Sequence, residues 1–259
     1  MDSAASPGML YHEASGKGPL LVLLHAVGLQ GDWWKTYVGA LRGQFRVVTI
    51  DLAGHGKSAL NSATVTLSDH ARGVEQVVRL HGEPAHVVGV SMGGMVAQTL
   101  AIEHSGAVAS LCLLSTMATV SDPARQMIAE RGARAVKEGM KSVIEPTVER
   151  WVLPGETNSA FAQRCREQLA RNEPKNWSAN WKAISELHTL DRLGDIQCPT
   201  FICTGIEDQS TTPAMARVMA ENIKGSKLEL LGDIAHLGAF EHPERFLPLL
   251  RSHLPKRTN

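Results

Sequence analysis

The 259-residue sequence lacks a net charge, because 26 Lys and Arg residues balance 26 Asp and Glu residues, and no block of like charges stands out. Proteins that bind nucleic acid or an anionic membrane usually carry a basic patch, so neither is expected as a partner. Long hydrophobic runs are also missing: LLVLLHAV is far shorter than the roughly 20 residues that span a bilayer. The first twenty residues show no basic segment followed by an apolar one, so we expect no secretory signal.

Cysteine is scarce. The four cysteines form no C-x-x-C pair and stand near no histidine at zinc spacing, so we expect no bound metal. Scattered cysteines of this kind are most often reduced core residues, and a reduced cytoplasm is the expected location. The composition leaves the oligomeric state open.

The sequence does have a regular alternation of short apolar runs and helical patterns. The apolar runs are continuous and rich in Val, Ile and Leu, which favours strands buried on both faces of a parallel sheet. They cover residues 19–27, 45–54, 85–91, 108–116, 199–205 and 226–233. Helical patterns between and after them cover residues 67–82, 93–106, 212–225 and 242–254. This alternation predicts an α/β fold with a mostly parallel, doubly wound sheet.

Residues 122–189 break this rhythm, because helical patterns follow one another there without a convincing strand. We therefore predict an α/β core formed by residues 1–121 and 190–259, with residues 122–189 inserted between two strands as a helical lid. A lid would lie over the carboxyl ends of the strands, where open α/β sheets bind ligands. The alternative is that the segment only covers an edge of the core.

The segment GVSMGGM, residues 89–95, places Ser91 in a G-x-S-x-G sequence between a predicted strand and a predicted helix. In this context a sharp turn lifts the serine hydroxyl above the sheet, and the glycines relieve crowding around a strained backbone. The helix also points its amino end at the site, which favours developing negative charge. Ser91 is therefore a candidate nucleophile, which needs a base and an acid that orients the base.

Candidates for the base and the acid follow late strands. His236 stands in a loop between the strand of residues 226–233 and the last predicted helix, and Asp208 follows the strand that ends at Gly205. The order Ser, Asp, His along the chain separates one fold class from other proteins with a triad. Glu207 is the alternative to Asp208, and a core position is the alternative role for His236.

Five segments in order resemble the α/β-hydrolase family over nearly the whole chain. They are LLHAVGLQGDWW, DLAGHGKS, the serine segment, GIEDQSTTP and AHLGAFEHPERF. The resemblance implies an α/β-hydrolase fold and a catalytic triad of Ser91, Asp208 and His236, without a metal or an organic cofactor. It also implies an oxyanion hole formed by the backbone N–H groups of Val27 and Met92.

Two loop positions need separate comment. Ala26 stands where the family usually has glycine, so it is expected to shift the oxyanion loop slightly. His25 and His55 lie in motif loops, where structural hydrogen bonding is the favoured role, although His25 is also a candidate for substrate binding. Ser115 ends a strand where some hydrolases place an alternative acid; serine cannot act as one, which favours Asp208.

The lid most resembles that of the 3-oxoadipate enol-lactonases, through ERGARAVKEGM, TVERWV and AISELHTLDRLGDIQCPT. This likeness implies hydrolysis of a small-molecule lactone or ester through an acyl-serine intermediate, in aromatic catabolism. Such an enol-lactone carries a free carboxylate, which Arg131 and Arg134 on one helical face would bind; the alternative is a solvated face. Trp151 is a further candidate for substrate binding, either as a pocket wall or as lid core.

Other functions stay open. A general carboxylesterase or a carbon–carbon bond hydrolase would use the same triad and differ in substrate range. A lyase of the same fold would use the triad to abstract a proton and would form no acyl-enzyme. A non-catalytic ligand sensor would bind a ligand tightly without turnover.

Overall fold

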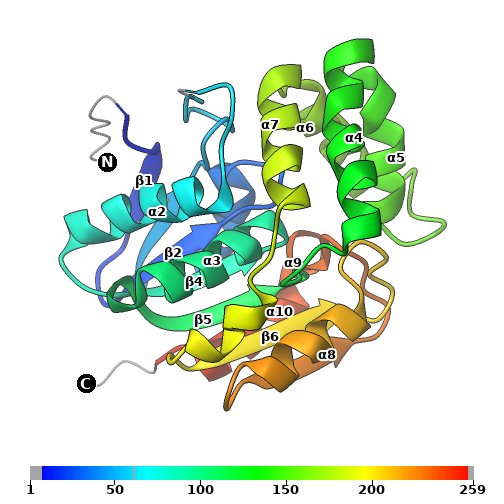
Figure 1. The fold of residues 1–259 in the computed structure, drawn as a ribbon. Helices are drawn as coiled ribbons and strands as arrows, with labels where there is room; N and C mark the ends of the chain where they lie inside the picture. The colour runs from blue at the N-terminus through cyan, green and yellow to red at the C-terminus, as the bar shows by residue number, and fades with distance from the viewer. Residues whose placement is uncertain (1–7, 61, 256–259) are drawn as a thin grey trace.

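The computed structural model describes residues 8–60 and 62–255, and a seven-stranded sheet lies at its centre in the order β1-β3-β2-β4-β5-β6-β7 (Figure 1). Strands β2 to β7 are parallel to one another, which confirms the predicted mostly parallel sheet. They are β2 (Leu20–Leu24), β3 (Arg46–Ile50), β4 (Ala85–Val90), β5 (Val108–Leu114), β6 (Thr200–Gly205) and β7 (Lys227–Leu231).

One strand was not predicted. Strand β1 (His12–Ser15) pairs with β3 in the antiparallel sense at one edge of the sheet. Its sequence, HEAS, contains no apolar run, and its middle residues are exposed. An edge strand with this composition is held by its backbone pairing, which leaves no hydrophobic signal in the sequence. Residues 1–7, part of the segment considered for a secretory signal, lie outside the described residues.

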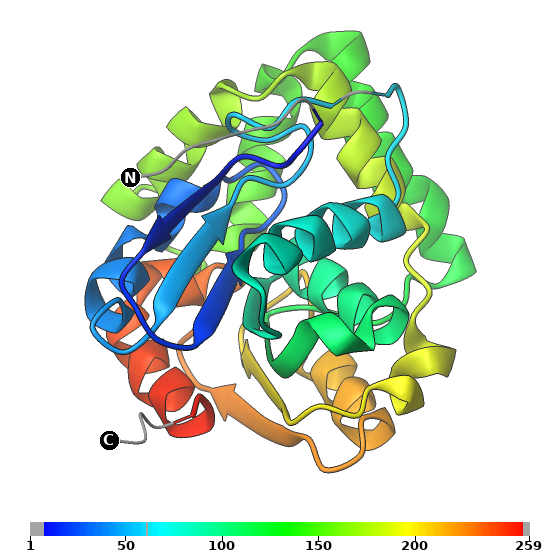
Figure 2. The same cartoon turned by 90° about the vertical axis from the view of Figure 1, so that its left-hand side faces the viewer.

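Helices cover both faces of the sheet (Figures 1 and 2). On one face lie α2 (Leu67–His81), α3 (Met92–Glu103) and α8 (Pro213–Asn222), and on the other α1 (Lys35–Leu41) packs beside α10 (Pro243–His253). Shorter elements are η1 (Gly31–Trp34), η2 (Ser105–Ala107), η3 (Leu190–Asp195) and α9 (Gly238–Glu241). This two-sided arrangement is why the strand sequences are continuously apolar rather than alternating.

The apolar residues concentrate in the sheet and in the helix that carries the candidate nucleophile. All five residues of β2 are fully buried, and α3 is buried over its first ten residues, Met92 to Ala101. The other long helices keep exposed polar faces. Among the described residues, no helix combines the length and the apolar character needed to cross a membrane.

The register of the strands brings their carboxyl ends to one edge of the sheet. The pairs at this edge are Leu24 with Gly89, Val90 with Leu114, Leu114 with Cys203, and Gly205 with Leu231. Loops that leave these strands therefore start side by side, although they are distant in the sequence. This edge is where open α/β sheets place their sites.

Four consecutive helices occupy the described range 122–189, between β5 and β6. They stand together over the carboxyl edge of the sheet, with α4 packed along α7 (Figure 1). We call them the cap helices: α4 (Asp122–Glu138), α5 (Lys141–Trp151), α6 (Ala160–Ala170) and α7 (Pro174–Ser185). They fall within the range expected for a lid, and their action as a lid stays a prediction.

A buried hydrogen bond ties the cap to the core. The Nε2–H of His70, on α2, donates to Oδ1 of Asn180, on α7, at 2.9 Å, and Asn180 Nδ2 donates to the Ala53 carbonyl at 3.2 Å. Because Asn180 uses its NH₂ group elsewhere, its oxygen must face His70, which places the histidine proton on Nε2. His70 Nδ1 is buried without a partner among the described residues. Burial lowers the pKa of His70 to about 4, so the ring is neutral at pH 7.

This tie predicts an acid-sensitive stability. In the unfolded chain His70 takes up a proton near its ordinary pKa of about 6.5, whereas the folded chain resists protonation until about pH 4. The unfolded state therefore binds more protons between these values, and the free energy of unfolding falls as the pH falls from about 6.5 to 4. His70→Gln, which keeps an N–H donor for Asn180, should reduce that slope by about 1.4 kcal/mol per pH unit.

The measurement is urea unfolding at a series of pH values between 4 and 7. His188→Gln, at an exposed histidine outside this tie, is the matched control and should keep the wild-type slope. An unchanged slope in His70→Gln would contradict the assignment of His70 as a buried neutral residue.

Candidate active site

Ser91 sits on a tight turn between β4 and α3. Its backbone has φ 54° and ψ −117°, a region that non-glycine residues rarely occupy. A Cβ atom on Gly89 would lie 2.3 Å from the Gly93 carbonyl oxygen, and one on Gly93 would lie 2.3 Å from the Leu24 carbonyl oxygen. Only glycine fits at either position, so the G-x-S-x-G sequence is required by the close approach of three backbone segments.

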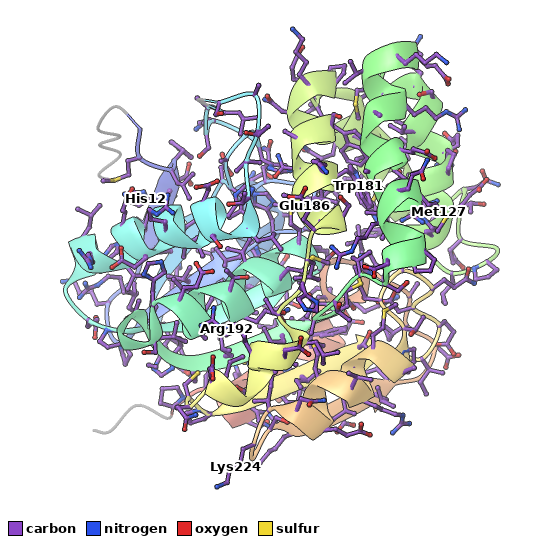
Figure 3. All side chains as sticks on the ribbon, in the orientation of Figure 1. His12, Met127, Trp181, Glu186, Arg192 and Lys224 are labelled. Atoms are coloured by element: carbon purple, nitrogen blue, oxygen red, sulfur yellow. The ribbon has the colours of Figure 1, made fainter. Side chains whose placement is uncertain are left out.

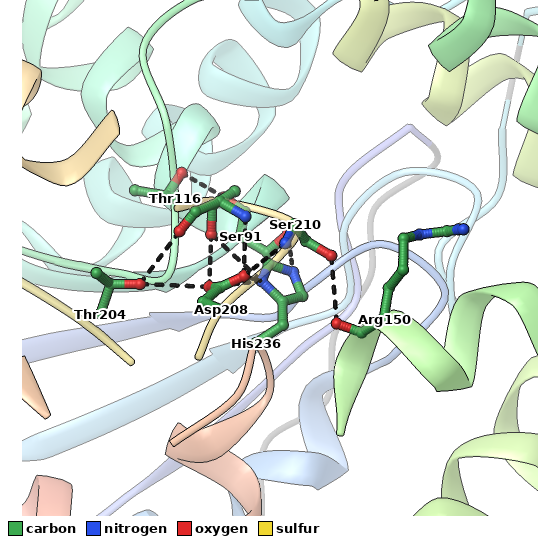
Figure 4. Close-up of polar contacts among 8 residues, drawn as sticks. Ser91, Thr116, Arg150, Thr204, Asp208, Ser210 and His236 are labelled. Carbon is green, nitrogen blue, oxygen red and sulfur yellow. Dashed lines mark hydrogen bonds and ion pairs between the residues drawn. The ribbon is translucent and has the colours of Figure 1, made fainter. Parts of the chain in front are cut away.

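The structure brings Ser91, His236 and Asp208 together in one hydrogen-bonded row (Figure 4). His236 Nε2 lies 3.0 Å from Ser91 Oγ, and His236 Nδ1 lies 2.9 Å from Asp208 Oδ2. All three side chains are buried, with exposed fractions of 5% or less. The arrangement suits proton transfer from the serine hydroxyl to an imidazole that a carboxylate orients.

The Asp208 carboxylate receives several hydrogen bonds besides the one from His236. Oδ1 accepts from the backbone N–H groups of Ser210 and Thr211, each at 2.8 Å, and Oδ2 accepts from Thr211 Oγ1 at 2.8 Å and Thr204 Oγ1 at 3.3 Å. Burial acts to raise the pKa of Asp208, but the His236 charge and the hydrogen bonds from His236 and Thr211 outweigh it and lower the pKa. The carboxylate is therefore ionised at neutral pH.

The two alternative positions for the acid have other surroundings. Glu207 Oε2 accepts a hydrogen bond from the Ile234 backbone N–H at 3.0 Å, so its carboxylate is engaged away from His236. Ser115 directly follows β5 with φ 43°, and its buried hydroxyl has no hydrogen-bond partner among the described residues. Asp208 is the carboxylate that contacts the histidine.

The two proposed oxyanion donors lie on either side of the serine turn. Met92 is the first residue of α3, so its N–H has no acceptor within the helix. The Leu29 N–H donates to the Ala26 carbonyl at 3.1 Å, which closes a β-turn with Val27 and Gly28 at its centre. Neither N–H has an acceptor among the described residues.

Ala26 does not take the conformation that would require glycine. The left-handed residue of this turn is Gly28, with φ 77°, and among the described residues the non-glycine positions with positive φ are Ser91, Ser115 and Asp233. The backbone freedom that the loop needs is therefore supplied at Gly28. The expected shift of the loop by Ala26 stays a prediction.

His25 is a structural residue, which corrects its place among the substrate-binding candidates. Its Nδ1–H donates to the Ala26 carbonyl at 2.8 Å, and its Nε2 accepts from the Leu52 N–H at 3.0 Å. It is fully buried and lies outside the cavity described below. His55 Nε2 similarly accepts from the Gly28 N–H at 2.9 Å. Burial lowers the pKa of both rings, which keeps these nitrogens available as acceptors.

A cavity of about 350 Å³ opens at Ser91 and His236, between the sheet edge and the cap helices. Its wall is mostly apolar, and Trp181 on α7 and Met127 on α4 lie at the ends of their helices nearest the core (Figure 3). The apolar lining includes Val27, Met95, Met117, Ile128, Trp151, Ile184, Met215 and Val218. An apolar cavity with a few polar groups is typical of small-molecule sites.

Two half-buried arginines line the same cavity. Arg131, on α4, was expected; its guanidinium lies 5.4 Å from the centre of the Trp181 ring. Arg150, on α5, was missed, although it stands in the TVERWV segment; its side chain extends away from the triad (Figure 4). Burial lowers the pKa of Arg131, and burial together with the charge of Arg131 lowers the pKa of Arg150 to about 10. Both arginines therefore remain charged at pH 7.

Arg134 lies outside the cavity, which corrects its assignment as a partner of Arg131. It is exposed, and its Nε atom pairs with Glu138 Oε2 at 2.9 Å. Residues three apart on an α-helix point about 60° apart, so only one of the two can face α7 directly. Glu138 stands one turn further along the helix, where it pairs with the outer arginine.

Trp151, the remaining candidate for substrate binding, does line the cavity. Its side chain is buried, and its carbonyl accepts a hydrogen bond from the Leu237 N–H at 3.2 Å, next to His236. Thr204 and Thr211, which hold Asp208, were not predicted. Thr211 stands in the GIEDQSTTP segment, where a polar run after the acid was the available signal.

The triad geometry predicts that Ser91→Ala lowers kcat for p-nitrophenyl acetate by about 10⁴-fold or more, because no other group would form the acyl intermediate. Circular dichroism should show an unchanged fold. Ser115→Ala is the matched control, since Ser115 is also a buried serine of positive φ at the end of a neighbouring strand, and it should keep near wild-type activity. Retained turnover in Ser91→Ala would contradict the assignment.

Comparisons with known proteins agree with this geometry. Residues 21–249 match the model of the alpha/beta hydrolase family. The chain is 29% identical to 3-oxoadipate enol-lactonase 1 of Acinetobacter baylyi, over 89% of this chain and 86% of that protein. It is 30% identical to a pimeloyl-(acyl-carrier protein) methyl ester esterase of Methylococcus capsulatus, over 95% and 98% of the two chains. The solved structure of the enol-lactonase from Burkholderia xenovorans LB400 has a TM-score of 0.91 at 25% identity and covers 98% of this chain and 100% of its own. The chain therefore belongs to the α/β hydrolase family.

Proposed function

We propose that the chain is a serine hydrolase that opens a lactone or cleaves a carboxylic ester through an acyl-serine intermediate. At the level of enzyme class it is a carboxylic ester hydrolase, as its named relatives are. The row of Ser91, His236 and Asp208 at the mouth of an apolar cavity supports the acyl-serine route. Cavity size and lining support a small-molecule substrate.

In the first half of the reaction, Ser91 Oγ attacks the carbonyl carbon while His236 Nε2 takes the hydroxyl proton. The hydrogen bond from His236 Nδ1–H to Asp208 leaves Nε2 as the unprotonated nitrogen, which faces Ser91. Negative charge develops on the carbonyl oxygen, where the N–H groups of Val27 and Met92 would stabilise it. Each such donor typically contributes about 3 kcal/mol to the stability of the transition state.

In the second half, His236 gives its proton to the leaving oxygen, and the carbonyl re-forms as the acyl-serine. Water then enters and attacks the acyl carbon while His236 takes one of its protons. The second tetrahedral intermediate collapses as His236 returns that proton to Ser91 Oγ, and the released carboxylic acid loses its own proton to solvent. With an enol-lactone, the released enol relaxes to a ketone, which draws ring opening forward. Asp208 stays ionised throughout and stabilises the imidazolium.

We further propose that the substrate carries a carboxylate, with 3-oxoadipate enol-lactone of aromatic catabolism as the best candidate. The observation that carries this proposal is the pair of charged arginines, Arg131 and Arg150, in the wall of the cavity that holds Ser91. Neither guanidinium forms an ion pair with a carboxylate among the described residues. A half-buried cation without a carboxylate partner favours an anionic ligand.

A general carboxylesterase is the second candidate. It is supported by the apolar lining of the cavity and by the likeness to a methyl ester esterase. This reading keeps the same triad and the same chemistry, and differs only in the use of the arginines. The lyase and the ligand sensor have no observation in their favour.

The two candidates predict different results for Arg131→Leu. If Arg131 binds a substrate carboxylate, the variant should lower kcat/KM for 3-oxoadipate enol-lactone by about 10- to 100-fold, because a hydrogen bond to a charged group contributes about 1.5–3 kcal/mol. The loss should appear mainly in KM. Turnover of the neutral p-nitrophenyl acetate should change by less than about threefold. Arg150→Leu should follow the same pattern.

Arg134→Leu, on the same helix but outside the cavity, is the matched control and should match the wild type on both substrates. A wild-type enzyme that prefers the neutral ester over the acidic lactone would favour the general esterase. An equal loss on both substrates in Arg131→Leu would contradict a role in carboxylate binding.

A further inference from the structure

The cap helices hold the oxyanion loop directly, at Gly28. The Gly28 carbonyl accepts hydrogen bonds from Asn172 Nδ2 at 2.9 Å and from Gln168 Nε2 at 3.3 Å. On its other side, a Cβ atom on Gly28 would lie 2.7 Å from Trp177 Cζ3 and 2.8 Å from Leu169 Cδ2. The residue after the proposed oxyanion donor Val27 is therefore enclosed by side chains that the cap supplies.

Gly28 is anchored at both of its polar groups. Its N–H donates to His55 Nε2, in the core, at 2.9 Å, and its carbonyl accepts from Asn172, in the loop between the cap helices α6 and α7. These groups belong to the two peptide planes that flank the Gly28 Cα atom. The Leu29 N–H lies in the same plane as the Gly28 carbonyl and donates to the Ala26 carbonyl, which shares its own peptide plane with the Val27 N–H. The hold on Gly28 therefore reaches the Val27 N–H through this turn. The core therefore binds the N–H of Gly28, and the cap segment binds its carbonyl.

The side chain of Asn172 links the end of α6 to the Gly28 carbonyl. It follows α6, and its Nδ2 atom also lies 3.1 Å from the Gln168 carbonyl and 3.3 Å from the Leu169 carbonyl at the end of that helix. The side chain therefore spans from the last turn of α6 to the oxyanion loop. The contact from Gln168 is longer, so Asn172 makes the shortest link between the cap and Gly28.

We propose that Asn172 is a positioning residue that aligns the Val27 N–H with the oxyanion through the Gly28 carbonyl, so that the oxyanion hole is assembled jointly by the core and the cap. This inference rests on the proposed function, because it assigns Val27 as a donor to the transition state. A donor matters only if it is held where the charge develops. Loosening the turn therefore reduces the stabilisation of the transition state and leaves ground-state binding of the substrate unchanged.

The test compares Asn172→Ala and the isosteric Asn172→Asp with Ser159→Ala. Ser159 caps the opposite end of the same helix, where its Oγ accepts from the Ala162 N–H at 3.1 Å, and it makes no contact with Gly28. Removal of such a cap destabilises the helix, so Ser159→Ala controls for a loss of stability at α6. Both Asn172 variants should lower kcat and kcat/KM for p-nitrophenyl acetate by about tenfold or more, with KM within about twofold. Asn172→Asp should lose most, because a carboxylate would face the Gly28 carbonyl oxygen.

Phenylboronic acid gives an independent readout, because its tetrahedral adduct with Ser91 places an oxygen in the oxyanion hole. Its inhibition constant, or its dissociation constant by calorimetry, should rise in the Asn172 variants by about the same factor as kcat/KM falls. Ser159→Ala should lose stability and keep both kcat and the boronate affinity.

Two results would overturn the proposal. In the first, the Asn172 variants lose stability but keep kcat and boronate affinity. Asn172 would then only bind the carbonyls at the end of α6, without a role in the reaction. In the second, Ser159→Ala loses as much kcat as the Asn172 variants, which would trace the effect to general loosening of the cap. If the wild type turns over neither the ester nor the lactone, the proposed function fails, and the boronate affinities still decide the role of Asn172.

Discussion

The close approach of three backbone segments around Ser91 is the constraint on which the site depends. Strand β4, helix α3 and the end of β2 come together so tightly that Gly89 and Gly93 cannot carry a side chain. Holding a serine at φ 54° costs on the order of 1–3 kcal/mol, and the burial of α3 against the sheet offsets that strain. The same turn positions the Ser91 hydroxyl and the Met92 N–H, so the proposed nucleophile and one proposed oxyanion donor cannot shift independently.

Four buried histidines differ in their hydrogen-bond partners and therefore in their roles. His25, His55 and His70 are buried, with lowered pKa values, and serve as neutral hydrogen-bonding groups that hold loops and the cap. His236 is equally buried, but it faces the Asp208 carboxylate, which can stabilise an imidazolium. The difference between these histidines is therefore the partner: neutral amide and carbonyl groups for the structural rings, and a carboxylate for His236.

The cap does more than cover the cavity, because it contacts the loops that carry Asp208, His236 and Val27. The carbonyls at the end of α5 accept hydrogen bonds from Ser210 Oγ at 3.4 Å, beside the acid, and from the Leu237 N–H at 3.2 Å, beside the histidine. Asn172 contacts the loop of Val27 and Gly28 through its side chain, which donates to the Gly28 carbonyl. The segment that forms one wall of the cavity thus also contacts the loops that carry the proposed catalytic groups.

Much of the core could be anticipated because its signals are local. A buried parallel strand needs a continuous apolar run, and a strand-to-helix turn as tight as that at Ser91 needs glycines on both sides, so the sequence by itself determined the sheet, the serine turn and the strand ends that Asp208 and His236 follow. The polar edge strand β1 could not be predicted, because pairing through the backbone leaves no pattern of side chains in the sequence.

Only the tertiary structure decided which side chains meet across the cap. The spacing of Arg131 and Arg134 showed that they lie near one helical face, but the packing of α4 on α7 determined that one lines the cavity and the other pairs with Glu138. Arg150 belongs to α5 and Asn172 to the loop between α6 and α7, and their places depend on how these helices pack over the sheet edge. Helical periodicity specifies angles around one axis, and it contains no information on the partner toward which that axis is turned.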